Sequence, residues 1–188
     1  MKKLLLALPL GLALTVVSQA SFAFTGTINF QGRIDSVTCP IEVIDPVTGA
    51  PGGPILIGYN YTKDFPTVGS ESVGKTFQLK LTPGGGCTVP PGSTAATVTF
   101  SSVHGGVGPG NELYGLKPLT GVAEGIAVAI KDNMGALIPN GAASKQYPIS
   151  ITDPSTMAFH VVYKSYLPAA NIAAGPAEAD VNFTVNII

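Results

Sequence analysis

The residue types that most often do chemistry are few in this chain and widely spaced. It contains two cysteines, Cys39 and Cys87, and two histidines, His104 and His160. Two thiols can join in a disulfide or contribute to a metal shell, but alone they cannot complete the four ligands of a zinc site. Neither histidine lies in an H-E-x-x-H pattern, and the sequence has no G-x-S-x-G elbow and no P-loop. We therefore predict no catalytic residue, no metal site and no cofactor.

The acidic residues point the same way. Most of them adjoin turn signals or the ends of alternating segments, where a carboxylate serves as a turn or surface group. Paired-carboxylate catalysis would need two of them side by side in space. The acids considered are Asp35, Glu42, Asp45, Asp132, Asp153 and Asp180.

The N-terminus reads as a secretory signal peptide. Lys2 and Lys3 precede an apolar run over residues 4–17, and small residues follow at Ser21 and Ala23. The apolar run is too short for the roughly 20 residues of a spanning helix. We expect cleavage after Ala23, with Ser21 as an alternative first residue. The expected mature chain, 24–188, keeps 8 of the 10 basic residues against 11 acidic ones, so nucleic acid is not an expected partner.

Export changes the interpretation of the two cysteines. In an oxidising compartment a lone pair of thiols is most often a structural disulfide, so we predict a bond between Cys39 and Cys87. Closing a loop of this length should contribute on the order of 4 kcal/mol, mostly by restricting the unfolded chain.

Alternation of apolar and polar residues predicts that the mature chain is built from strands. Gly- and Pro-rich turn signals separate the alternating segments, and no linker or composition shift divides the chain. This spacing is typical of a single all-β sandwich domain over residues 24–188. The segments are 34–43, 75–81, 94–100, 125–130, 157–163 and 179–187, with 54–58 as a possible further edge strand.

The first alternating segment differs from the others. Phe24, Gly26, Ile28 and Phe30 share one face of the stretch "FTGTINFQGRI". Glycine contributes no side chain to a core and costs backbone entropy, so this face packs poorly in the chain's own sheet. Glycine fits better where another backbone or a bulky side chain approaches closely.

The mature sequence resembles the pilin subunits of chaperone-usher fimbriae, in particular the type 1-like shaft pilins. The resemblance is carried by "GTINFQGRIDSVTC", "KTFQLKLTPGGGC", "GIAVAIKDNMGALI", "FHVVYKSY" and "AGPAEADVNFTVNII". Gly175, fourteenth from the end, matches a usual glycine of the family, whereas Ile187 stands where the family usually has tyrosine. The family also pairs the two cysteines.

The resemblance implies an immunoglobulin-like sandwich that lacks its last strand and is completed by a strand from a neighbouring subunit or a chaperone. Residues 24–34 would form the donated extension, with Phe24, Gly26, Ile28 and Phe30 facing the acceptor's groove. The implied partners are identical or related pilin subunits, a periplasmic chaperone and an outer-membrane usher, and the implied destination is a fimbrium at the cell surface. The implied groove edge and chaperone-binding residues are Gly175, Val181, Phe183, Val185, Ile187 and Ile188.

A secreted monomeric β-sandwich that binds a carbohydrate or another ligand is the alternative. The chain has no tryptophan for sugar stacking, and its six tyrosines show no clustered pattern. Gel filtration without a chaperone separates the two classes, because a pilin polymerises, aggregates or fills its groove with its own extension, whereas a binding domain stays monomeric.

Overall fold

The computed structural model describes residues 41–45, 49–52, 54–84, 87 and 89–188. The chain divides into units 1–33 and 34–188, and all described residues belong to the second. Their regular structure is almost entirely strand, with three short 3-10 turns, η1 (Thr62–Asp64), η2 (Pro109–Asn111) and η3 (Ala169–Asn171). The strands are β1 (Ile41–Ile44), β2 (Lys75–Leu81), β3 (Ala95–Ser102), β4 (Gly106–Val107), β5 (Leu113–Tyr114), β6 (Ile126–Asp132), β7 (Leu137–Ile138), β8 (Tyr147–Pro148), β9 (Ser155–Ser165) and β10 (Val181–Ile187).

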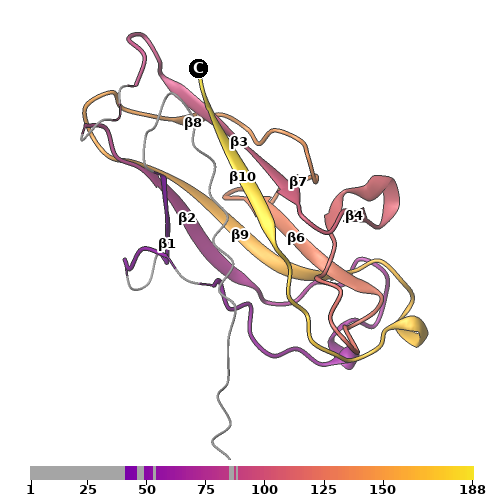
Figure 1. Cartoon of the computed structure of the whole chain (residues 1–188). Helices are drawn as coiled ribbons and strands as arrows, with labels where there is room; N and C mark the ends of the chain where they lie inside the picture. The colour runs from indigo at the N-terminus through magenta and orange to yellow at the C-terminus, as the bar shows by residue number, and fades with distance from the viewer. Residues whose placement is uncertain (1–40, 46–48, 53, 85–86, 88) are drawn as a thin grey trace, which may run out of the picture. The chain divides into compact units, whose positions relative to one another are not determined.

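Within this part of the chain the strands form two antiparallel sheets, which confirms the predicted all-β class (Figure 1). The larger has the order β1-β2-β9-β6-β5-β4, with β7 also paired to β6. The smaller has the order β10-β3-β8. Among the described strands neither sheet closes on itself, so both sheets keep edge strands.

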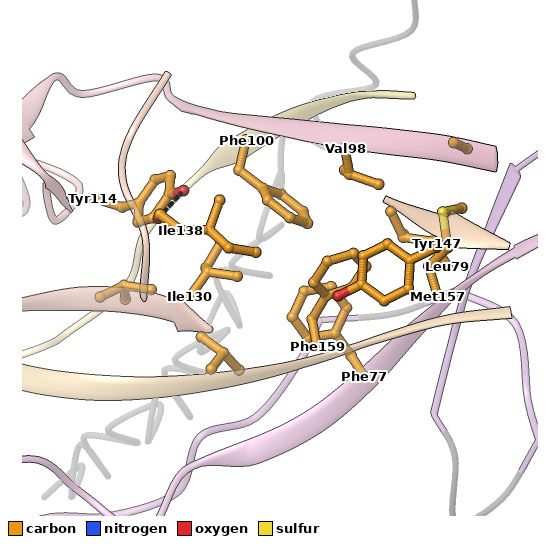
Figure 2. Close-up of a cluster of buried hydrophobic side chains, with 13 residues drawn as sticks. Phe77, Leu79, Val98, Phe100, Tyr114, Ile130, Ile138, Tyr147, Met157 and Phe159 are labelled. Carbon is orange, nitrogen blue, oxygen red and sulfur yellow. Dashed lines mark hydrogen bonds between the residues drawn. The ribbon is translucent and has the colours of Figure 1, made fainter. Parts of the chain in front are cut away.

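The core lies between the sheets because each strand turns its apolar residues to one side. Phe77 and Leu79 of β2 point inward while Lys75 and Thr76 are exposed, and β3 contributes Ala96, Val98 and Phe100. Figure 2 shows the two sets of side chains facing each other. The four aromatic rings at the centre lie with centroids 5.0–6.1 Å apart, in stacked, tilted and edge-on pairs, and belong to Phe77, Phe100, Tyr147 and Phe159.

Two buried tyrosines hold neighbouring elements through their hydroxyls. Tyr114 of β5 donates to the carbonyl of Ile138 in β7 at 2.9 Å (Figure 2), and Tyr147 of β8 donates to the carbonyl of Ala158 in β9 at 3.1 Å. Burial, and secondarily the negative charge of Asp132, raises the pKa of Tyr147 to about 12. Both hydroxyls therefore stay protonated and act as donors at neutral pH.

Strand β6 is buried on both faces, which explains its near-continuous apolar sequence. Val128 and Ile130 pack in the main core, whereas Ala127 and Ala129 face the other side of the sheet. There they pack with Val162 under Leu113, so a second, smaller cluster covers the outer face of the large sheet.

One sequence prediction needs correction, and three others lie wholly or partly outside the described residues. Residues 54–58 form no strand, because no described strand lies beside them and Gly58 has a left-handed φ of 96°. Of the predicted segment 34–43, only 41–43 are described, and they belong to β1. The signal peptide and the extension 24–34 lie outside the described residues. The remaining predicted strands, 75–81, 94–100, 125–130, 157–163 and 179–187, match β2, β3, β6, β9 and β10 within a few residues.

Candidate functional site

One side of the β10 backbone has no strand partner within the described part of the chain. Its register pairs Ile188 with Ala95, and these two residues exchange both backbone hydrogen bonds, at 2.9 and 3.1 Å. Because bonded and non-bonded pairs alternate along an antiparallel ladder, the even-numbered residues of β10 bond to β3 and the odd-numbered ones point their N–H and C=O groups away from it. Among the described residues no strand pairs with this second side.

The same odd-numbered residues carry the apolar side chains of β10. Val181, Val185 and Ile187 pack against the main core but remain partly exposed, and Phe183 is 36% exposed. None of the seven residues of β10 is buried, in contrast to the inward residues of β3 beside it. The core is therefore incompletely covered along the strand that also has an open backbone edge.

The other sheet edges in the described part of the chain are poor places for strand addition. β8 has two residues, one of which is Pro148, which has no N–H. β4 also has two residues. The outer side of β1 is partly occupied by the chain itself, because Gly52 donates to the carbonyl of Val43 at 2.8 Å. β10 therefore offers the longest open edge of the described strands.

The segment that leads into β10 is firmly attached to residues 117–124. Lys117 donates its N–H to the carbonyl of Glu178 at 2.7 Å, and Ala123 donates to Pro176 at 2.9 Å. The hydroxyl of Tyr163 donates to the carbonyl of Ala177. These bonds fix where β10 begins, and with it the position of the open edge.

Gly175, predicted at the groove edge, lies in this attached segment before β10. A Cβ built on it would lie 2.0 Å from the carbonyl oxygen of Gly121 and 2.7 Å from the nitrogen of Ala123. The position therefore requires glycine because two backbone segments approach each other there. The structure separates it from the other predicted edge residues, which follow one another along β10.

A polar cluster at the start of β10 was not anticipated from the sequence. The Asp180 carboxylate lies 2.9 Å from His104 Nε2 and 4.0 Å from Lys117 Nζ, and the backbone carbonyl of Asp180 accepts the N–H of Val103 at 2.9 Å. The three side chains come from three separate loops, so no local pattern could reveal the cluster. Asp180 immediately precedes β10, so these contacts hold the start of β10 next to the end of β3.

Only one of the two cysteines of the predicted disulfide lies among the described residues. Cys87 is buried, 6% exposed, and packs with Leu81 and Val89 next to Ile187. The described part of the chain has no free cysteine. Cys39, Phe24, Gly26, Ile28 and Phe30 lie outside the described residues, so the disulfide and the donor strand stay predictions.

Both histidines contact groups of other loops and strands, His104 through Asp180 and His160 through β2 and the residues before it. His160, which the alternation places outward, contacts the carbonyl of Val73 at 3.0 Å and the Thr76 hydroxyl at 3.3 Å. It lines a hollow of about 440 Å³ on the outer face of the large sheet, where Lys131 pairs with Glu71. No group of residues suited to holding a metal, and no helix long and apolar enough to cross a membrane, occurs in the described ranges.

The family assignment follows from comparison with known proteins. A family model described as "Fimbrial protein" matches residues 28–187. The chain belongs to the fimbrial protein family. A type-1 fimbrial protein subunit of Serratia marcescens is 29% identical over 194 residues, covering 98% of each chain. The fimbrial-like protein FimF of Salmonella typhimurium is 31% identical over 173 residues, covering 90% of this chain and 89% of the relative.

Solved structures agree on the architecture. The P pilus rod subunit PapA superimposes with a TM-score of 0.55 at 16% identity, covering 73% of this chain and 93% of that one. The predicted immunoglobulin-like sandwich is therefore confirmed as the fold. Together the family and the fold support a structural subunit of a cell-surface fimbrium rather than a secreted monomeric binding domain.

Proposed function

We propose that this protein polymerises into a fimbrium by strand donation, with β10 as the acceptor edge. The observation that carries the proposal is the coincidence, on β10, of an unpaired backbone side and an incompletely covered apolar face. An extended segment from a neighbouring subunit would hydrogen-bond to the odd-numbered residues and cover their side chains in one step.

The extension 24–34 has the sequence such a segment needs. Its alternation puts Phe24, Ile28 and Phe30 on one face, with Gly26 between them. Burying three large apolar side chains at roughly 1.5 to 3 kcal/mol each gives on the order of 4 to 9 kcal/mol before the backbone bonds are added. The contact should therefore dissociate slowly.

Residues 55–57 supply a second flank for the same segment. Ile57 packs against the main core cluster, as Val181 and Val185 do, while its neighbours Ile55 and Leu56 are exposed. This apolar stretch forms no strand in the described structure. A donated strand between it and β10 would give it a partner and account for its apolar, strand-like composition.

Before assembly, the same edge needs protection from aggregation. We propose that a periplasmic chaperone lays a strand along β10 and binds the carboxylate of Ile188, and that an outer-membrane usher exchanges the chaperone for the next subunit. The exposure of Phe183 and Ile188 supports this need, because an open edge with apolar side chains pairs readily with other chains. Assembly at an usher would place the polymer at the cell surface.

Two substitutions in the extension test strand donation. Ile28→Ala should weaken the polymer by roughly 2 to 4 kcal/mol per contact, because it empties an apolar position. Gly26→Leu should block donation by a clash, while leaving the subunit's own acceptor edge intact. We therefore expect the Gly26→Leu subunit to be exported and chaperone-bound, yet to form no fimbriae by electron microscopy. Normal fimbriae from this variant would show that the extension is not the donor strand.

A further inference from the structure

The outer edge of β3 is sealed by a loop rather than by a full strand. β3 pairs with β10 through its odd-numbered residues, so Ala96, Val98, Phe100 and Ser102 point their backbone groups to the opposite side. Residues 140–149 run along that side. Only Tyr147 and Pro148 of this loop form a strand with β3, and they reach only Ala95 and Ala96.

Beyond Ala96 the loop keeps one isolated β-bridge to β3, between Ala143 and Thr99, and two of its side chains accept N–H groups of β3 on either side of that bridge. The Ser144 hydroxyl accepts the N–H of Val98 at 2.9 Å, and the Asn140 side-chain oxygen accepts the N–H of Ser102 at 2.8 Å. Backbone bonds alternate with them, since Ser144 donates its N–H to the carbonyl of Val98 and Gly141 donates to that of Phe100, each at 2.8 Å.

The positions of the two side chains are well determined by their surroundings. Ser144 is 8% exposed, and its hydroxyl donates in turn to the carbonyl of Lys145 at 2.7 Å. Asn140 is held by its own N–H, which donates to the carbonyl of Glu112 at 2.9 Å. Both groups thus present an acceptor to β3 in a fixed orientation.

The two long strands of the small sheet, β10 and β3, therefore differ in whether the backbone groups on their outer sides have hydrogen-bond partners. On β10 the odd-numbered backbone groups have no partner among the described residues, whereas on β3 the outward N–H groups of Val98 and Ser102 are satisfied by side chains. We propose that Asn140 and Ser144 are specificity-determining residues that confine strand capture to β10, so that each subunit accepts one strand and the polymer grows without branches. This inference rests on the proposed strand donation.

Loss of the seal should create a second strand-binding edge. In Asn140→Ala/Ser144→Ala, the N–H groups of Val98 and Ser102 lose their side-chain acceptors, so this part of the loop is held to β3 only by its backbone bonds to Val98 and Phe100. An extended peptide can then displace it and satisfy the outward groups of β3 instead. In assembled filaments the β10 edges are already filled, so added peptide reports on the β3 edge alone.

The probe is a labelled synthetic peptide of residues 24–34, added to purified filaments, with a scrambled peptide that lacks the alternation as reference. Wild-type filaments should bind the peptide only at their ends, whereas filaments of the double variant should bind up to about one peptide per subunit and show branches by electron microscopy. Ser70→Ala is the matched control, because it removes a serine hydroxyl that accepts the N–H of Thr67 at 3.1 Å, away from β3. It should behave as wild type.

The single variant Asn140→Ala keeps the buried hydroxyl and serves where the double variant does not assemble; it should bind an intermediate amount. If filaments of the variant that assembles take up no more peptide than wild type and stay unbranched, the proposal is overturned. Normal fimbriae from Gly26→Leu would instead refute strand donation by the extension. The two experiments therefore distinguish a failure of this inference from a failure of the proposed function.

Discussion

Phe183 offers a direct measure of what a docked strand adds to the subunit. It is 36% exposed and lies on the apolar face of β10. For a phenylalanine surface of about 200 Å², roughly 70 Å² remains to be covered, and at about 25 cal/mol per Å² its burial by a donated strand contributes about 1.8 kcal/mol. Phe183→Ala should therefore raise the dissociation constant of the donated strand about 20-fold.

The assay is the rate at which filaments release subunits in denaturant, extrapolated to water. Phe183→Ala also removes buried surface within the subunit, so its free energy of unfolding is measured separately and the loss specific to the assembled state is taken as the difference. Met134→Ala is the control, because Met134 is 81% exposed in the turn between β6 and β7. If Phe183→Ala filaments dissociate no faster than those of Met134→Ala, β10 is not the acceptor edge.

Three further predictions concern the disulfide, the C-terminus and pH. Alkylation of the exported protein under denaturing, non-reducing conditions should leave Cys39 and Cys87 unmodified, and reduction should lower stability by about 4 kcal/mol; labelling of both thiols would exclude the bond. A few residues appended after Ile188 should abolish capture by the chaperone, and an unchanged yield of the complex would leave β10 as a plain core strand. Because burial raises the pKa of Tyr147 from 10.0 to about 12, the folded state holds this proton more tightly, so the free energy of unfolding should fall as pH rises from 10 towards 12. Tyr147→Phe should flatten that alkaline slope in chemical denaturation, and an unaltered slope would assign it to other groups.

Local patterning was a good guide to the strands. "KTFQLKL" alternates so regularly that the predicted bounds, 75–81, are those of β2. The even alternation of Val181, Phe183, Val185 and Ile187 likewise placed them on one face of β10. Such predictions succeed because successive side chains of a strand point to opposite sides whatever the strand packs against.

Predictions were wrong or missing where the outcome depended on residues that meet only in the folded chain. Residues 54–58 have strand composition but form no strand, because strand structure requires a hydrogen-bonded neighbour. The role of Gly175 at the groove edge stays a prediction, and the structure adds a close approach to Gly121 that only the folded chain creates. The contact of Asp180 with His104 joins loops far apart in the sequence.

The sequence by itself determined that the protein is a chain of short strands with an unusual alternating first segment, because the period of its side chains is a local property. The family resemblance implied that the C-terminal strand borders a groove, and the tertiary structure decided which strand edges in the described part of the chain have hydrogen-bond partners. Whether a backbone N–H is satisfied depends on what lies beside it in space: β3 faces Ser144 and Asn140 on its outer side, whereas the described residues place no strand along the outer side of β10. Pattern identifies strands, and only packing distinguishes a sealed edge from one that can receive another chain.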